Sequence, residues 1–356
     1  MTDIAIRILE SVEGPPTISE LLGNYSMKDQ LFLPFDSPDK EDWSYWPRER
    51  AGLALALMNE PQLVLTQELL WSLVSPEGYF KLLNIMHLEN FLVHYTNDGF
   101  PRSMNDYILV FFGEPSASEP WSWRFEGHHI SLNVTVSEGA VAVTPSFVGV
   151  KPSPVPAGPL TGLRILRTEE DNARALIHSM SPEQREQARL AGDPQYNAYA
   201  ESIGVSTFDD APHDPYGGHF LKPRDRWQDW REQTLPAGLK ATDLTEDQRP
   251  YLQAIVDEVT GIYREDIVAP YNIDIDDLYF GYIGSFEPGG LIYFRLSGSD
   301  FVYEFDYTQA EDDHIHTIWR SRSNDLGSDL LKHHHDHFHN GPADTHTHQP
   351  NANAIE

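Results

Sequence analysis

The stretch Phe125-Glu-Gly-His-His-Ile-Ser-Leu-Asn-Val-Thr-Val136 decides the fold class, because its polar and apolar side chains alternate as they do along a β-strand. Alternation places His129, Ser131 and Asn133 together on a wholly polar face. His128 then heads the opposite, apolar face, where we expect it to support the site rather than form it. An imidazole, a hydroxyl and a carboxamide in a row favour a functional face over a plain surface strand.

Further strands are expected around this stretch, because apolar runs are separated by Gly, Pro and Ser clusters. The predicted strands cover 107–112, 121–125, 129–136 and 139–145, with a second block between 277 and 319. The segment 136–140 has the composition of a hairpin turn. The core is therefore expected to be a mainly antiparallel sheet.

Helices are predicted where apolar residues recur at a spacing of three and four. These segments are 51–58, 62–74 and 79–94, followed by 168–176, 181–191 and 247–263. Ser75-Pro76 and Ser181-Pro182 are typical of an N-cap followed by proline at the first helical position. The polar stretch 192–238 is predicted to be a long loop.

These segments predict an α+β fold in which a helical N-terminal region, 1–105, packs on an α+β core, 106–332. We expect the two regions to form one fold unit. The tail 333–356 holds seven of the chain's sixteen histidines and has no apolar periodicity. We expect this tail to be disordered and to bind metal ions only weakly.

Composition excludes several classes of function. The formal charge of −30, from 25 Lys and Arg against 55 Asp and Glu, disfavours binding to nucleic acid or to anionic membranes. The chain has no run of apolar residues long enough for a membrane helix and no secretory leader, so we expect a cytoplasmic protein. It has no cysteine, which leaves histidine and carboxylate side chains as the candidate ligands of a transition metal.

A second histidine pair, His314 and His316, lies in the later strand block. Two imidazoles at positions i and i+2 of a strand share a face and can reach one metal ion, and His129 is the expected third ligand. Such nitrogen ligands suit a divalent metal: Zn for hydrolysis, or Fe, Mn or Cu for oxygen chemistry.

Carboxylates near both histidine segments complete the candidate site. Glu126, Glu304 and Asp306 are each candidates for a fourth ligand or a general base, and Arg320 is a candidate anchor for a substrate carboxylate. The same residue types also build buried ion-pair networks that have no catalytic role. Both interpretations remain open at the level of sequence.

Three hypotheses for function follow. The first is a metal-dependent enzyme that acts on a small organic substrate. The second is a metal-free enzyme in which His129 is a general base and Ser131 a nucleophile. The third is a protein that binds a small ligand or a metal without catalysis.

The chain resembles the bacterial and fungal family called domain of unknown function 3500. The resemblance spans about residues 20 to 335 and rests on the segments 33–38, 42–43, 121–133, 304–309, 314–320 and 325–331. It implies that both histidine segments matter in the family, without implying a reaction. Tyr307 departs from the family pattern, in which asparagine is expected, so no role is carried over to that side chain.

Overall fold

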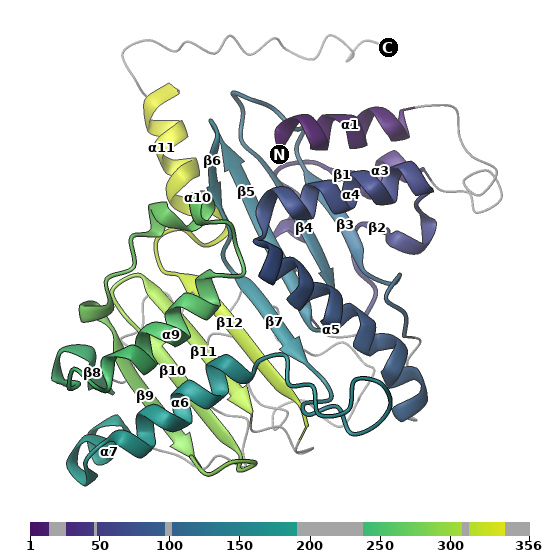
Figure 1. Cartoon of the computed structure of the whole chain (residues 1–356). Coiled ribbons are helices and arrows are strands. Elements are labelled where there is room, and N and C mark those ends of the chain that lie inside the picture. Colours follow the sequence, from purple (N-terminus) through teal and green to yellow (C-terminus); the bar gives the residue numbers. More distant parts are fainter. Residues whose placement is uncertain (14–25, 46–47, 97–101, 191–237, 308–312, 339–356) are drawn as a thin grey trace, which may run out of the picture.

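The computed structural model describes residues 1–13, 26–45, 48–96, 102–190, 238–307 and 313–338. Helices lie against a single twisted sheet, and the sheet takes strands from both the N-terminal region and the later part of the chain (Figure 1). The predicted α+β class, with helices packed on a mainly antiparallel sheet, is confirmed.

In the described part of the chain the sheet has twelve strands, and every neighbouring pair among them is antiparallel except β1 and β3. Its main path runs β1-β3-β4-β5-β7-β12-β11-β10-β9-β8, while β2 pairs with β3 and β6 pairs with β5. The strands are β1 (Phe32–Leu33), β2 (Leu53–Ala54), β3 (Ile108–Phe112), β4 (Trp121–Gly127), β5 (Ile130–Ser137), β6 (Ala140–Ala142), β7 (Ser146–Val150), β8 (Leu239–Lys240), β9 (Tyr279–Gly284), β10 (Ile292–Ser297), β11 (Phe301–Tyr307) and β12 (Ile315–Ser321). The histidine-bearing segments before β5 and at β12 are thus separated only by β7.

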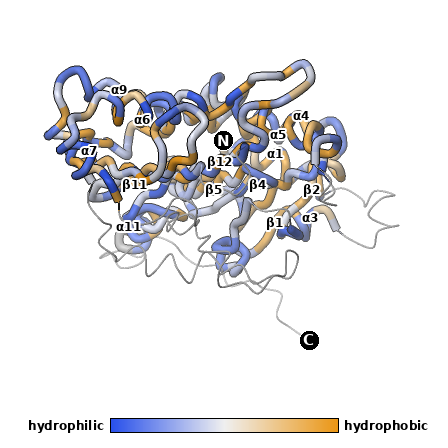
Figure 2. Tube along the Cα trace, turned by 90° about the horizontal axis from the view of Figure 1, so that it is seen from below, coloured by the Kyte–Doolittle hydropathy of each residue, from blue (hydrophilic) through white to orange (hydrophobic). Residues whose placement is uncertain are grey.

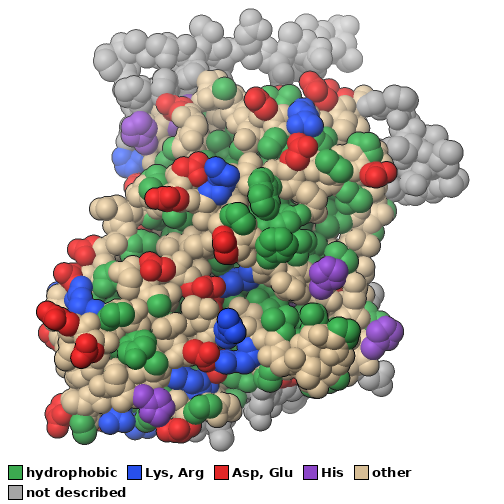
Figure 3. All heavy atoms as spheres, viewed as in Figure 1, with side chains coloured by type: hydrophobic (Ala, Val, Ile, Leu, Met, Phe, Trp, Pro, Cys, Tyr) green, Lys and Arg blue, Asp and Glu red, His purple; other side chains and the backbone are tan. Residues whose placement is uncertain are grey.

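One face of the sheet is covered by helices and carries the apolar core (Figure 2). The longer helices are α1 (Thr2–Val12), α4 (Glu60–Leu73), α5 (Pro76–Tyr95), α6 (Arg167–Ser179), α9 (Arg249–Thr260) and α11 (Ser328–Phe338). On the outer side of α4 and α5, hydrophobic side chains gather at the surface, including the exposed Trp71 and Phe80 (Figure 3). Full burial of each large apolar side chain in the core stabilises the fold by about 1.5–3 kcal/mol.

The opposite face of the sheet is polar and is nevertheless buried. Strand register places the following buried residues on this face: Arg124, Glu126, Ser131, Asn133, Arg295, Glu304, Asp306, His316 and Arg320. The segment after β1 covers part of it, because Trp43 and Tyr45 pack there on Phe147 and Ile318. The charged groups of a buried polar face need partners. The partner of each group indicates whether the residue has a structural role or is a candidate for the site.

Most helix predictions are confirmed by α4, α5, α6 and α9, with shifts of a few residues at their ends. Ser75 accepts the backbone N–H of Gly78, and Ser181 forms a capping box with Gln184, as their N-cap patterns predicted. The prediction of a helix over 51–58 is wrong. That segment forms β2 and the 3-10 turn Leu55–Leu57, because pairing with β3 overrides its local spacing.

The remaining predictions concern turns and long segments. The hairpin at 136–140 is confirmed: Glu138 and Gly139 both have positive φ, as a type I′ turn requires. The expected loop 192–238 lies outside the described residues, except for its last position. In the histidine-rich tail, α11 continues to Phe338 where irregular chain was expected from residue 333, and 339–356 lie outside the described part. Among the described helices, none is long and apolar enough to cross a membrane.

Candidate metal centre

The first histidine segment is a tight turn rather than the start of a strand. β4 ends at Gly127 and β5 begins at Ile130, so His128 and His129 form the two-residue connection of a hairpin. His129 has φ of 66°, a left-handed conformation that costs a residue with a side chain about 1–3 kcal/mol. The strand expected over 129–136 therefore begins one residue later, at Ile130, although the His129 ring still lies beside His316 on the Ser131 side of the sheet.

Neighbouring strands fix this turn in place. The backbone N–H of His129 donates to the Tyr45 carbonyl at 3.1 Å, and its carbonyl accepts from Gly149 N–H at 2.7 Å. Tyr107 donates its hydroxyl to the His128 carbonyl at 2.5 Å. Both carbonyls of the turn thus accept hydrogen bonds, and these bonds hold its strained backbone in a single arrangement.

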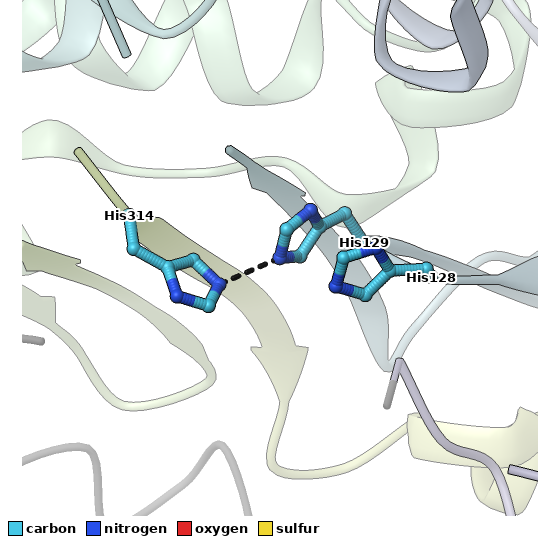
Figure 4. Close-up of side chains that lie close together, drawn as sticks. All are labelled: His128, His129 and His314. Atoms are coloured by element: carbon cyan, nitrogen blue, oxygen red, sulfur yellow. Dashed lines mark hydrogen bonds between the residues drawn. The ribbon is translucent and has the colours of Figure 1, made fainter. Parts of the chain in front are cut away.

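The turn brings three imidazoles together. Among the described residues, one nitrogen from each of His128, His129 and His314 lies within 4.8 Å of the other two (Figure 4). The rings of His128 and His129 stack with centroids 3.7 Å apart, and His129 Nε2 lies 2.7 Å from His314 Nε2. We expected His316 in this trio and His128 in a supporting position. The structure instead places His128 in the trio, because both turn residues face the start of β12.

His316 lies beside the trio. Its ring centroid is 4.5 Å from that of His314 and 5.5 Å from that of His129. The side chain is buried, and its Nε2 has no hydrogen-bond partner among the described residues. A buried nitrogen without a hydrogen-bond partner destabilises the fold, and a ligand bound beside this imidazole would remove that cost.

Gly149 on β7 provides the space in which these rings approach. A Cβ atom at this position would lie 3.0 Å from His129 Cδ2 and 3.1 Å from His316 Cδ2. Both contacts are tighter than ordinary van der Waals packing, so a larger residue would push the two rings aside. Sequence patterns gave no sign of this role, since a glycine inside a strand has several common explanations.

His128 is oriented by a carboxylate from a helix. Its Nδ1 lies 2.5 Å from Glu89 Oε1 on α5, and Arg102 Nη1 lies 3.3 Å from the other oxygen of Glu89. When Nδ1–H donates to Glu89, the lone pair of the imidazole is on Nε2. A carboxylate that orients a histidine in this way is typical of metal-binding histidines.

Glu89 was missed by sequence reasoning, although a signal was present. It follows Leu82, Ile85 and Met86 at helical spacing on the buried side of α5, where an acidic residue is unusual. The two histidines of the same helix, His87 and His94, are both exposed and take no part in the cluster.

Electrostatics keeps the clustered imidazoles neutral. Burial lowers the pKa of His129 well below its ordinary value, and the neighbouring imidazoles lower it further. Burial has the same effect on the pKa of His314, and it lowers the pKa of His316 to about 3. Burial also lowers the pKa of His128, although Glu89 opposes the shift. Neutral imidazoles keep the lone pairs that bind metal ions.

The candidate carboxylates separate into two groups. Asp306 is directly opposite His316 in the β11–β12 register, so their Cβ atoms are about 4.5–5.5 Å apart. Glu304, two residues before Asp306, is opposite Ile318 in the same register and accepts a hydrogen bond from Tyr293. Of the three predicted carboxylates, Asp306 is the one that register places beside a clustered histidine.

Glu126, by contrast, is part of an arginine network. Its Oε2 lies 3.2 Å from Arg124 Nε and accepts from Ser44 N–H at 2.9 Å, and its Oε1 lies 3.6 Å from Arg50 Nε. Ser131 Oγ donates to the same carboxylate at 3.2 Å. Ser131 is therefore bonded to Glu126 and not to His129, which gives no support to the metal-free pair of base and nucleophile.

Two further predicted residues lie in structural contacts. Asn133 Nδ2 donates to the Pro145 carbonyl at 2.9 Å. Arg320 Nη1 donates to Asp325 Oδ2 at 2.9 Å, and its guanidinium stacks over Trp43. Arg320 lies four positions after His316 on β12, about 13 Å along the strand. Arg320 is thus placed in a buried ion pair away from the histidines.

A family model described as Protein of unknown function (DUF3500) matches residues 18–328. The chain belongs to this family. The resemblance noted from the sequence is thereby confirmed, and both histidine segments lie within the match. Neither a curated protein nor a solved structure matches the chain significantly. The chemistry of the site must therefore be argued from its own geometry.

Proposed function

We propose that the chain is a metal-dependent enzyme that acts on a small organic substrate, with His128, His129 and His314 as the metal ligands. The observation that carries the proposal is a trio of neutral imidazoles, one buried and two partly buried, whose nitrogens lie within 4.8 Å of one another. Neutral imidazoles that converge in this way present lone pairs that a single cation can bind together.

The donor set fits a first-row divalent metal such as Zn, Fe, Mn or Cu. Three imidazoles from the protein leave a coordination position open for water or substrate, as in catalytic rather than structural sites. When bound, such an ion polarises a substrate oxygen or lowers the pKa of a bound water.

The approach of His129 and His314 also suits this proposal. Their Nε2 atoms are 2.7 Å apart, as in a hydrogen bond, whereas two imidazoles on one tetrahedral ion are roughly 3.3 Å apart for metal–nitrogen bonds of about 2.0–2.1 Å. An outward shift of about half an ångström separates the two arrangements. Small ring rotations supply such a shift without a change in the backbone.

We assign proton transfer to Asp306 and His316, which lie beside the residues that would hold the metal ion. Asp306 is buried and lies opposite His316 in the sheet. A buried carboxylate beside an imidazole is a suitable general base. Glu126, Glu304 and Arg320 then hold the polar face together instead of meeting substrate.

Elemental analysis of the full chain tests the metal site. After loading with each of the four metals and gel filtration, the protein should retain one ion that is lost in His129→Ala and in His314→Ala. His87→Ala is the matched control, because His87 is exposed and outside the cluster. Equal metal contents in all four proteins would assign the ions to the histidine-rich tail and refute the proposed site.

Catalysis needs a separate assay. Each metal-loaded protein is tested for hydrolysis of p-nitrophenyl esters and for oxygen uptake with small phenols and carboxylic acids. Activity should require the metal and should fall about 10²-fold or more in Asp306→Asn while the metal content stays unchanged. A variant that retains full activity would remove Asp306 from the mechanism.

A further inference from the structure

A second candidate site lies on the far side of β12 from the histidines, between β9 and β11 and the connection that follows α10 (Glu265–Val268). A hollow of about 310 Å³ opens there. Its lining residues are Tyr271, Asn272, Ile273, Asp274, Asp277, Leu278, Ser299, Asp300, Phe301 and Trp319. This volume is at the lower end of the range that holds small ligands.

Three aromatic rings form the floor of the hollow. Trp319 packs against Tyr271 with centroids 4.9 Å apart and planes tilted by 56°. The Phe301 ring lies 5.9 Å from the indole, tilted by 41°. All three rings line the hollow, and an aromatic lining is a feature by which proteins bind organic cations.

Three carboxylates line the same hollow, and no lysine or arginine does. Asp277 accepts from Ser299 N–H, and Asp274 accepts from Asp276 N–H at 2.9 Å, so both are held in place by backbone donors. Asp300 accepts from Ser323 N–H at 2.7 Å. Lys240 and Arg322 interact with Asp277 and Asp300 from outside the lining, and they offset part of the negative charge.

Trp319 adds an independent observation. The residue is 2% exposed, and its indole Nε1–H has no hydrogen-bond partner among the described residues. A buried donor without an acceptor costs about 1–3 kcal/mol. A ligand in the hollow that carries an oxygen acceptor would remove this cost.

From these contacts we propose that the hollow binds a small organic ammonium ion that carries a hydroxyl or similar acceptor, such as an amino alcohol. The aromatic floor takes the cationic group by cation–π attraction, and the carboxylates add a Coulombic preference for positive charge. The acceptor is available to the Trp319 indole. This site is separate from the proposed metal centre, because Trp319 and His316 are on opposite faces of β12.

Calorimetric titration of the full chain with choline tests the proposal. The matched neutral probe is 3,3-dimethyl-1-butanol, which has the same shape and hydroxyl but no charge. Choline should bind about tenfold or more tightly than this alcohol, since the charge-dependent attraction is worth at least about 1.4 kcal/mol. Equal affinities would show a merely apolar hollow and overturn the proposal.

Variants place the binding in this hollow. Asp274→Asn and Asp277→Asn keep the acceptor oxygens and remove one charge each, so each should weaken choline binding severalfold. Trp319→Phe should do the same by removing the indole N–H. Asp276→Asn is the control, because Asp276 adjoins the site but pairs with Arg249 outside the lining. Thermal unfolding of each variant confirms that it is folded.

Two outcomes would contradict the proposal outright. Choline binding that is unchanged in Asp274→Asn and Asp277→Asn would lie elsewhere on this acidic chain. Binding of calcium chloride, abolished by the same two variants while choline fails to bind, would assign the carboxylates to a metal ion instead.

Discussion

Two regions of the same buried polar face show how differently a protein can use buried polar groups. In the arginine region, Arg124 lies against Glu126, and Arg320 lies against Asp325. In the histidine region, three neutral imidazoles converge, and the Nε2 atoms of His129 and His314 lie 2.7 Å apart. A buried charge beside its counter-charge is already compensated, whereas converging imidazoles offer lone pairs that a metal ion can bind. The comparison therefore separates the candidate site from its scaffold.

The largest effect is expected from breaking the arginine region. Asp325→Ala leaves the Arg320 guanidinium without this carboxylate in a buried place, and should lower the free energy of unfolding by about 3–5 kcal/mol in urea denaturation. Asp266→Ala, at the exposed pair with Arg264, should change it by less than about 1 kcal/mol. Metal content should stay unchanged in both. A loss of metal in Asp325→Ala would join the two regions and weaken the comparison.

The next effect concerns the carboxylate that serves the histidine region. Glu89→Gln retains the shape of the side chain but not its charge, so the imidazole of His128 becomes a weaker ligand. Metal affinity, measured by competition with a chromogenic chelator, should fall about 10–100-fold. Glu77→Gln, at an exposed position of the same helix, should leave the affinity unchanged. Unaltered affinity in Glu89→Gln would mean that the charge of Glu89 does not strengthen His128 as a ligand.

The histidine region should also make the metal-free chain sensitive to acid. Burial lowers the pKa of His129 and His314 in the folded state, so the unfolded state binds protons first as the pH falls below about 6.5. The contribution of these two imidazoles to the free energy of unfolding is then fully present above pH 6.5. It is lost toward lower pH by up to about 1.4 kcal/mol per pH unit for each imidazole. For His316 this loss of stability continues down to about pH 3, because burial lowers its pKa in the folded state to about 3.

Urea denaturation between pH 7 and pH 4.5, in the presence of a chelator, measures this slope. His314→Asn should reduce this slope by the contribution of one titrating imidazole, whereas His87→Asn should leave the slope unchanged. A parent protein with no slope over this range would mean that the clustered imidazoles are not held neutral by burial.

The sequence predicted the arginine and histidine regions unequally, for physical reasons. Strand alternation correctly grouped Ser131 with Asn133, because the side-chain period is fixed by extended backbone. It failed at His129, where the backbone leaves the strand conformation. A left-handed histidine is uncommon, and nothing in the local pattern marks one in advance.

Long-range partners were the other limit. The approach of His129 to His314 was expected as a pairing of two segments, but the choice of His128 over His316 depends on a turn geometry that no spacing reveals. Glu89 reaches His128 from a helix about forty residues earlier, which only tertiary packing decides. The sequence left Glu126 open between a metal ligand or general base and an ion pair, and Arg320 open between substrate binding and an ion pair. Both side chains form ion pairs in the structure.

The smallest predicted effect tests whether the histidine region is shaped by its backbone cradle. In Gly149→Ala, a Cβ atom 3.0 Å from His129 Cδ2 must push two rings apart by a few tenths of an ångström. Overpacking of this kind costs about 1 kcal/mol, which corresponds to about fivefold weaker metal binding if the cost is borne by the site. Gly281→Ala is the matched control, because its Cβ would meet the Leu190 side chain within the same sheet. Both variants should lose similar stability, but only Gly149→Ala should lose affinity for metal. Equal affinities in the two would mean that the rings adjust freely, and that their close approach reflects packing rather than a preformed metal site.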